Sequence, residues 1–396
     1  MTSESGRPRD GEAPKSIPYG RQSIGPDDIE AVTAALKSDW LTTGPMVDRF
    51  EAAVADFAGA RHGVAVCNGT AALHMAMDAI GIGEGDEVIV PPITFVASAN
   101  SIVYQRGRPV FADVDPDTLL LDPAAAEQAI TSRTKAILAV DYAGQPCDYD
   151  ALRSLADRRG LSLIADGCHA LGAAYRGRRV GSLADITVFS FHPVKHVTTG
   201  EGGMAVTDDP DLASRMRRFR NHGISTDHRQ RAERGTYAYA METLGFNYRV
   251  TDFQCALGLS QLAKLPGWLG RRRAIAARYD LAFARLPGLR PLAVADGVSH
   301  AYHLYVVRLG PERPEGDRDA VYAALRKAGI GANVHYFPVH LQPYYRRTFG
   351  TGEGMCPRAE AAYPGLLSLP LYQGMEDADV ERVIAAVTKA FEDHAR

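Results

Sequence analysis

The stretch Ile186–Val206, ITVFSFHPVKHVTTGEGGMAV, decides the fold that we predict for this chain. It opens with alternating β-branched and aromatic residues, which is typical of a strand. A polar segment follows with a single lysine, Lys195, five positions after Ser190, and the run Gly200–Gly203 leads into a second short apolar segment. A lysine between two strands suits a lysine that must reach a buried cofactor. Taken alone, Lys195 would more often be a solvated loop lysine, so the rest of the chain decides.

The composition is that of an ordinary globular protein and excludes several classes of partner. The 396 residues are 46% hydrophobic with a net charge of −3, so no global field favours nucleic acid or an anionic membrane. The five cysteines are scattered without metal-ligand spacing, which favours a reduced, cytoplasmic setting and no metal site. No apolar run is long enough to span a bilayer. The polar residues 1–16 are expected to form a disordered tail.

Strand and helix patterns alternate over the first two thirds of the chain. Helices are predicted from Ser23 to about Ser38 and from Val47 to Phe57, and short apolar strands at 63–66, 87–90, 109–114, 136–140 and 161–165. Helical patterns separate these strands. The alternation predicts an α/β fold with a mostly parallel sheet that helices cover on both faces.

From about Pro266 the pattern changes. It predicts a helix at 271–286, a strand at 303–309, a helix at 317–328, a strand at 334–337 and a final amphipathic helix at 377–393. This is typical of a smaller α+β domain. We therefore divide the chain into the tail (1–16), a large domain (17–265) and a small C-terminal domain (266–396), with the first helix a candidate to pack against the small domain.

Polar residues fall at strand ends and helix starts, where ligands of open α/β sheets bind. Thr70 and Ala71 lie at a predicted helix N-terminus, where free backbone N–H groups favour a phosphate, although any helix start looks similar. Asp166 directly follows the strand at 161–165. Its carboxylate either binds a ligand or merely caps the next helix. Phe95 and His169, taken singly, would be a core residue and an ordinary hydrogen-bonding histidine.

Pyridoxal phosphate (PLP) needs all of these parts together. It requires a lysine for the Schiff base, an acid that keeps the pyridine nitrogen protonated, a phosphate cup and a flat side chain against the ring. The chain supplies the cup, the stacking ring, the acid, the second cup ligand and the lysine in the order Thr70, Phe95, Asp166, Ser190 and Lys195. A separation of 29 positions lets the acid and the lysine lie on neighbouring strand ends.

From about Ile17 to the C-terminal helix, the chain resembles the DegT/DnrJ-type nucleotide-sugar aminotransferases. The resemblance rests on QSIGPDDIEAV from Gln22, LTTGP from Leu41, PPITFVASAN from Pro91, VFSFHPVKHVTTGEGG from Val188, LGFNYRVTDFQCALGLSQLAKL from Leu244 and HYFPVHLQPYYR from His335. It implies PLP fold type I, the aspartate aminotransferase-like fold. Within the family, the chain is most similar to the aminotransferases of the pseudaminic acid pathway. It departs from the pattern at Asn68-Gly-Thr, at Cys168 and at Gly200-Glu.

The resemblance implies roles for the matching residues. Lys195 is the Schiff-base lysine and proton shuttle, Asp166 pairs with the pyridine nitrogen, His169 lies by the phenolic oxygen, and Phe95 stacks on the ring. The residues that hold the phosphate are Gly69, Thr70, Ala71, Ser190 and, from the second subunit, Asn247, which implies a homodimer with shared active sites. The residues that face the sugar nucleotide are Tyr19, Trp40, Leu41, Thr42, Thr43, Gly44, His335, Tyr336, Phe337 and Pro338.

The implied activity transfers the amino group of L-glutamate, which leaves as 2-oxoglutarate, to C4 of a UDP-linked 4-keto-6-deoxy-N-acetylhexosamine in amino-sugar biosynthesis. Both half-reactions share one site, which implies ping-pong kinetics. Three alternatives stay open. One is another keto sugar, aminated at C3 or C4 and linked to UDP or dTDP. The second is a PLP-dependent sugar dehydratase, whose relatives carry histidine in place of the lysine. The third is a non-enzymatic regulator, although the sequence shows no DNA-binding module.

Overall fold

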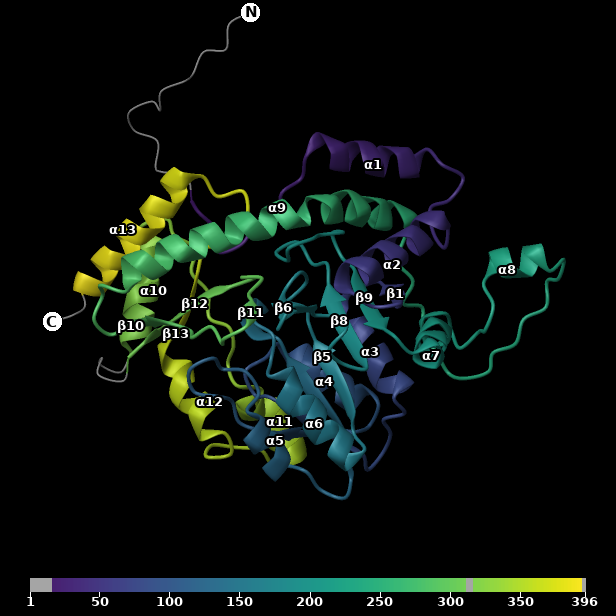
Figure 1. The fold of residues 1–396 in the computed structure, drawn as a ribbon, viewed down its shortest axis with the longest axis horizontal. Helices are drawn as coiled ribbons and strands as arrows, with labels where there is room; N and C mark the ends of the chain where they lie inside the picture. Colours follow the sequence, from purple (N-terminus) through teal and green to yellow (C-terminus); the bar gives the residue numbers. More distant parts are fainter. Residues whose placement is uncertain (1–15, 311–315, 394–396) are drawn as a thin grey trace, which may run out of the picture.

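The structure, a computed structural model, describes residues 16–310 and 316–393 (Figure 1). The predicted tail at 1–16 lies outside these residues apart from Ser16. A seven-stranded sheet forms the centre of the molecule. Its strands, in spatial order, are β1 (His62–Val66), β9 (Gly203–Thr207), β8 (Ile186–Ser190), β5 (Ser162–Asp166), β4 (Thr134–Val140), β2 (Glu87–Val90) and β3 (Arg108–Phe111). Only β9 runs antiparallel to the others, which confirms the predicted α/β class.

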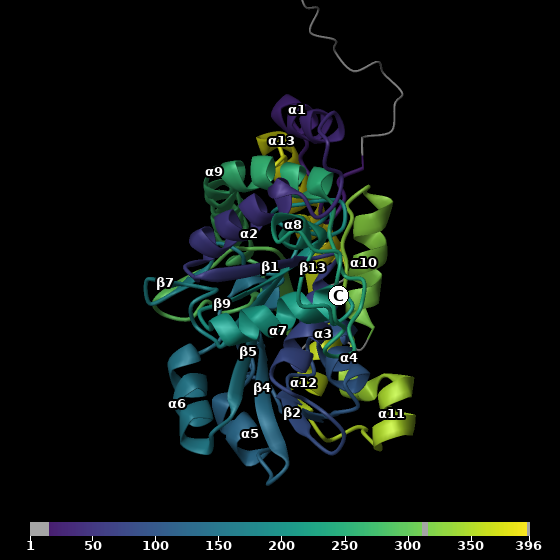
Figure 2. The ribbon, with the colours of Figure 1, turned by 90° about the vertical axis from the view of Figure 1, so that its right-hand side faces the viewer.

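Helices cover both faces of this sheet, as the buried β-branched strands require. The helices that precede residue 252 are α1 (Pro26–Leu36), α2 (Pro45–Ala58), α3 (Gly69–Ala79), α4 (Val96–Tyr104), α5 (Pro123–Gln128), α6 (Tyr149–Arg159), α7 (Pro210–Arg220) and α8 (His228–Glu233), of which α1 and α8 lie outside the layers that cover the sheet (Figure 1). Figure 2 shows α6 on one side of the sheet and α3 and α4 on the other. Strands β5 and β8 are parallel neighbours with Asp166 paired to Val188, so their carboxyl ends lie next to each other.

A second, smaller hydrophobic core lies around the three-stranded antiparallel sheet β10 (Leu289–Pro291), β12 (Tyr305–Leu309) and β13 (Leu366–Leu369). Two helices, α10 (Asp317–Lys327) and α13 (Asp377–Asp393), pack on it. The remaining elements are β6 (Ala174–Tyr175), β7 (Arg178–Arg179), β11 (Val298–Ser299), α11 (Pro343–Phe349), α12 (Pro357–Ala362) and the 3-10 helices at Tyr142–Gly144, Val339–Leu341 and Tyr363–Gly365. The division of the chain at residue 265 stays a prediction, because the two cores do not separate there. The small core also includes Ile17, and the large one includes Tyr345.

The long helix α9 (Asp252–Phe283) differs from the prediction. A helix was expected only from Arg271, because Pro266 removes a backbone donor and commonly ends a helix. The helix instead continues through Pro266, since its two halves pack on different layers. The first half contacts α1 and α2, and the second half enters the small core (Figure 1). The predicted strand at 334–337 is also wrong, since only an isolated bridge joins Asn333 to Ser368 there.

All five cysteines are free thiols. No helix within residues 16–310 and 316–393 combines the length and the apolar character that crossing a bilayer would require.

Asp28 ties α1 to α9. Its carboxylate is fully buried. It accepts hydrogen bonds from the backbone N–H of Gly25 at 2.8 Å, from Ser260 Oγ at 2.6 Å and from Gln261 Nε2 at 2.7 Å. Lys264 Nζ lies 2.6 Å from the same carboxylate. The carboxylate of Asp28 therefore accepts from the backbone N–H at the start of α1 and from three side-chain donors of α9.

We expect Asp28→Ala to lower the free energy of unfolding by about 1–3 kcal/mol, because buried donors lose their acceptor. The neighbouring Asp27, whose side chain is 57% exposed, contacts the same Lys264. Asp27→Ala is the matched control and should cost less than about 0.5 kcal/mol. Urea denaturation measures both variants. Equal losses in the two variants would contradict the anchoring role of Asp28.

The same anchor predicts a pH dependence of stability. Burial alone would raise the pKa of Asp28, but the hydrogen bonds from Gly25, Lys264, Ser260 and Gln261 bring its pKa below the ordinary value. A lowered folded-state pKa gives stability that is present above the unfolded-state pKa and is lost as the pH falls through the folded-state pKa. In acid, wild type and Asp28→Ala should therefore become more similar in stability.

Candidate active site

A cavity of about 570 Å³ lies where β5 and β8 end. Asp166, the last residue of β5, and Ser190, the last residue of β8, both line it. Lys195 enters from the loop that follows β8. The structure thus brings the acid and the lysine together on neighbouring strand ends, as the sequence predicted from their spacing.

The start of α3 forms one wall of this cavity. In the described structure, the backbone N–H groups of Gly69 and Thr70 have no hydrogen-bond acceptor, whereas the N–H of Ala71 donates to Asn68 Oδ1 at 2.8 Å. A Cβ at position 69 would lie 3.0 Å from the Cβ of Ser190, so the glycine lets the serine approach the helix start. Two free N–H groups, the helix dipole and a hydroxyl suit a phosphate. Ala71, predicted to bind it, offers an N–H that is already engaged.

Asp166 is nearly buried, and two donors hold its carboxylate. Ser98 Oγ donates to Oδ2 at 2.6 Å, and the backbone N–H of Cys168 donates to Oδ1 at 3.2 Å. Thr94 Oγ1 in turn lies 2.7 Å from Ser98 Oγ. Sequence reasoning missed Ser98 and Thr94. They belong to the quoted motif PPITFVASAN, in which Ser98 stands three positions after Phe95.

Lys195 contacts a histidine from a distant part of the chain. Its Nζ lies 3.5 Å from Nε2 of His303, which the sequence analysis did not single out. No local signal connects two residues 108 positions apart. Burial lowers the pKa of Lys195, while the nearby Cys168 and Asp166 act in the opposite direction. The lowered pKa increases the share of neutral amine, the form that attacks a carbonyl carbon.

His169 places a ring nitrogen without a partner in the cavity wall. Its Nε2 lies 3.2 Å from the hydroxyl of Tyr336, and its buried Nδ1 has no hydrogen-bond partner among the described residues. Burial, followed by the charge of Lys195, places the pKa of His169 well below its ordinary value, so the ring is neutral. Phe95 lines the same cavity and is 57% exposed, as a ring available for stacking must be.

The predicted sugar-nucleotide residues divide into two groups. Tyr19, His335 and Tyr336 line the Lys195 cavity, and the rings of Tyr19 and His335 are 5.4 Å apart. Phe337 and Pro338 do not line it. The ring of Phe337 instead packs edge-on against another aromatic side chain outside the cavity.

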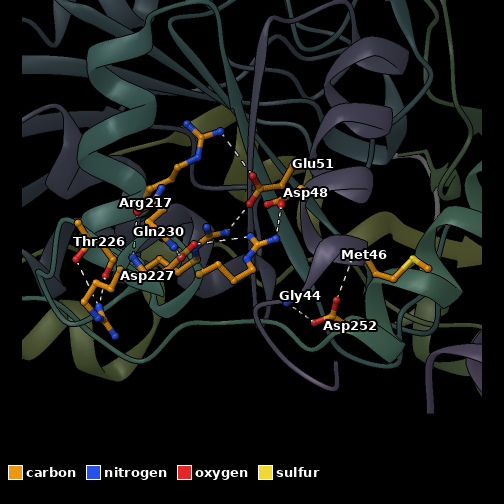
Figure 3. A network of polar contacts seen from close by, with 12 residues as sticks. Gly44, Met46, Asp48, Glu51, Arg217, Thr226, Asp227, Gln230 and Asp252 are labelled. Carbon is orange, nitrogen blue, oxygen red and sulfur yellow. Dashed lines mark hydrogen bonds and ion pairs between the residues drawn. The ribbon is translucent and has the colours of Figure 1, made fainter. Parts of the chain in front are cut away.

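The loop at 40–44 lies away from the Lys195 cavity. Figure 3 shows how it is held: the carboxylate of Asp252 accepts hydrogen bonds from the backbone N–H groups of Gly44 at 2.8 Å and Met46 at 3.0 Å. Thr43 lines a second cavity of about 460 Å³ beside α2, α7 and α8. Asn247 is exposed and also lies outside the Lys195 cavity. Within one chain, these predicted residues are therefore not assembled with Lys195.

The residues around Lys195 fit PLP. A reactive amine, a fixed carboxylate and a helix start with two free N–H groups are polar features that the cofactor requires. The ring nitrogen of His169 that has no partner among the described residues lies in the wall of the same cavity. A model of the DegT/DnrJ/EryC1/StrS aminotransferase family matches residues 22–388. The chain belongs to this family.

Relatives of this aminotransferase extend over nearly the whole chain. The spore coat polysaccharide biosynthesis protein SpsC of Bacillus subtilis is 44% identical over 94% of this chain and 96% of its own length. A putative sugar aminotransferase from Streptococcus pneumoniae, solved in its PMP form, is 33% identical with a TM-score of 0.90, over 95% of this chain and 99% of its own. PseC of Helicobacter pylori, an aminotransferase involved in pseudoaminic acid biosynthesis, is 33% identical with a TM-score of 0.89, over 96% of this chain and all of its own.

These comparisons confirm three predictions: the PLP fold type I, the PLP cofactor and the class of enzyme. The protein is a PLP-dependent sugar aminotransferase.

Proposed function

We propose that the protein transfers the amino group of L-glutamate to C4 of a UDP-linked 4-keto-6-deoxy-N-acetylhexosamine, in the cytoplasm, as a step of amino-sugar biosynthesis of the pseudaminic acid type. The observation that supports aminotransferase chemistry is that Lys195 and Asp166 line the same cavity. The likeness to PseC over 96% of the chain supports the choice of sugar.

The residues that line the cavity have separate roles in the proposed reaction. Nζ of Lys195 would take the proton from Cα of the donor and deliver it to the cofactor, and in the second half-reaction it would carry a proton from the cofactor to C4 of the sugar. Bound PLP supplies the electron sink for the carbon that loses the proton. The carboxylate of Asp166 would hold the pyridine nitrogen in its protonated form, and Ser190 with the start of α3 would hold the phosphate. Tyr19, His335 and Tyr336 orient the substrate carbon, which lowers the entropic cost of the proton transfer.

A panel of keto sugars tests the substrate. We would incubate the protein with L-glutamate and UDP- or dTDP-linked 3-keto and 4-keto sugars, and identify the amino sugar by mass spectrometry and NMR. The proposal predicts amination at C4 of the UDP-linked N-acetylhexosamine. Preferred amination at C3 or of a dTDP sugar would replace the proposed substrate, and failure to aminate any sugar would overturn the proposal.

A homodimer with shared sites is part of the proposal. The arm, which we define as residues 222–247 between α7 and α9, extends away from the body of the molecule with α8 (Figure 1). It exposes large apolar side chains, with Tyr237 at 95% and Leu244 at 76%. Such side chains gathered on one segment are typical of an interface, and a second copy of the chain is the usual occupant in an obligate dimer. Asn247 stands exposed at the end of the arm.

Mixing two inactive variants tests the sharing. Lys195→Ala lacks the amine, and Asn247→Asp places a negative charge where we expect the cofactor phosphate of the partner subunit. If sites are shared, a mixed dimer has both defects in one site and none in the other. Random exchange should then restore about a quarter of the wild-type activity. Each variant alone is the control, and two affinity tags verify exchange. No recovery after verified exchange would place Asn247 outside the partner's site.

A further inference from the structure

The side chain of His303 is the neighbour of the Lys195 amine that the proposed mechanism leaves unused. Nε2 of His303 is 3.5 Å from Nζ, and it is the one hydrogen-bonding contact of Nζ among the described residues. Such contacts are often long before ligands bind. The His303 ring also lies 4.3 Å from the ring of His169 and 5.6 Å from that of His196.

The backbone around His303 is held in place by a buried arginine and a glycine. Arg272 of α9 is fully buried, and its NH1 donates to the carbonyl oxygens of Tyr302 at 3.1 Å and His303 at 3.4 Å. Gly144 has a φ of +102°, and a Cβ there would lie 3.0 Å from the backbone nitrogen of His303. The segment thus packs directly on the turn after β4, which fixes the distance from the His303 ring to Lys195.

The hydrogen-bond partners of the His303 ring indicate which of its two nitrogens carries the proton. Nδ1 of His303 is buried and has no partner among the described residues. If Nδ1 carried the proton, the structure would hold an unsatisfied buried N–H, and Nε2 would accept from an N–H of the lysine, whether charged or neutral. If Nε2 carries the proton, it donates to the lone pair of a neutral amine, and only a lone pair on Nδ1 stays unsatisfied. Buried N–H groups without an acceptor are the rarer case, so this accounting assigns the proton to Nε2.

We propose that His303 donates its Nε2–H to Nζ of Lys195 and thereby holds this amine in its neutral form. His303 is a positioning residue that acts through Lys195, so the inference rests on the role proposed above for the lysine. The neutral amine is the form that attacks an aldehyde carbon, with loss of water, and the form that accepts a proton from carbon.

The other charged or titratable groups around Lys195 and His303 do not donate a hydrogen bond to the lysine amine. Burial lowers the pKa of Lys195, and the nearby carboxylate and thiol oppose this shift. Burial also lowers the pKa values of the neighbouring histidines, so these rings are neutral near pH 7. The groups that face the pair are Asp166 at the end of β5, Cys168 and His169 after β5, His196 beside the lysine, His335 after α10 and Arg272 on α9.

The test follows the rate at which the cofactor-free protein captures PLP, by absorbance, as a function of pH. For His303→Leu, which has no donor, we expect the pH midpoint to rise by about one unit. His303→Gln places an amide N–H near the position of Nε2 and should restore the midpoint. His300→Leu is the control, because His300 hydrogen-bonds the backbone of Tyr302 and not Lys195. An unchanged or lowered midpoint in His303→Leu would overturn the inference.

A second readout does not depend on any variant. Nitrogen-15 NMR of the histidine-labelled wild-type protein should show a protonated Nε2 and an unprotonated Nδ1 at His303, and the opposite tautomer would overturn the inference even if His303→Leu failed to fold. Borohydride labelling of the wild-type protein separates this inference from the proposed function. A label at Lys195 supports the lysine's role whichever way the midpoint moves in His303→Leu, and a label on another lysine would count against that role.

Discussion

Lys195→Ala should lose turnover by at least about 10³-fold, because it removes both the cofactor-binding amine and the proton-transfer group, and the latter contributes 10²–10⁴ by itself. The fold should survive, since the side chain makes one hydrogen-bonding contact, to His303, in the described structure. Urea midpoints and rates of amino-sugar formation measure the two effects.

Lys135→Ala is the matched control for this variant. Lys135 is an exposed lysine at the start of β4, away from the cavity. Its replacement should leave turnover within the error of the assay. Residual turnover of Lys195→Ala within tenfold of wild type would contradict the assigned role, because a lysine that only lines the cavity would give such a result.

Asp166→Asn should reduce kcat by about 10²–10³-fold with the cofactor still bound. The amide keeps the shape of the side chain but removes the charge that favours a protonated pyridine nitrogen. Loss of one preorganised electrostatic group costs about 3–4 kcal/mol in the barrier. The amide also retains only one acceptor oxygen, whereas Ser98 and Cys168 each donate to a separate oxygen of the carboxylate.

Asp141→Asn is the matched control, because it removes a carboxylate at the end of the neighbouring strand β4 instead of at the end of β5. Asp141 follows β4, is fully buried, and is held by the N–H of Cys147 and the hydroxyl of Tyr149. It does not line the Lys195 cavity. We expect its replacement to leave the absorbance spectrum of the bound cofactor unchanged, whereas Asp166→Asn should alter it. Near wild-type kcat in Asp166→Asn would reduce Asp166 to a structural role.

The features that the sequence predicted correctly are those that short-range patterns determine. The strand ahead of Asp166 and the strand ahead of Lys195 are apolar runs that end in polar residues, and parallel strands bring such ends to one edge of the sheet. The start of α3 was predictable because Asn68 caps it. These local signals, together with the motif resemblance, were enough to assemble Lys195 with Asp166 and Ser190 in one cavity.

The features that the sequence did not predict depend on contacts between distant segments. Ser98 reaches Asp166 across 68 positions, and His303 reaches Lys195 across 108. No periodicity encodes either contact. The path of α9 through Pro266 likewise depends on packing against α1, α2 and the small core, which outweighs the local preference of proline. Within one chain, Asp252 holds the loop at 40–44 beside a separate cavity, and the place of this loop at the sugar nucleotide stays a prediction.

The most direct test of the central claim is to locate the lysine that binds PLP. Borohydride reduction of the PLP-loaded wild-type protein fixes the cofactor on the lysine that holds it, and peptide mapping by mass spectrometry then identifies that residue. The account predicts a single labelled peptide, with the modification on Lys195 and none in Lys195→Ala. A label on any other lysine, or an unlabelled Lys195 in a protein that forms amino sugar, would contradict it.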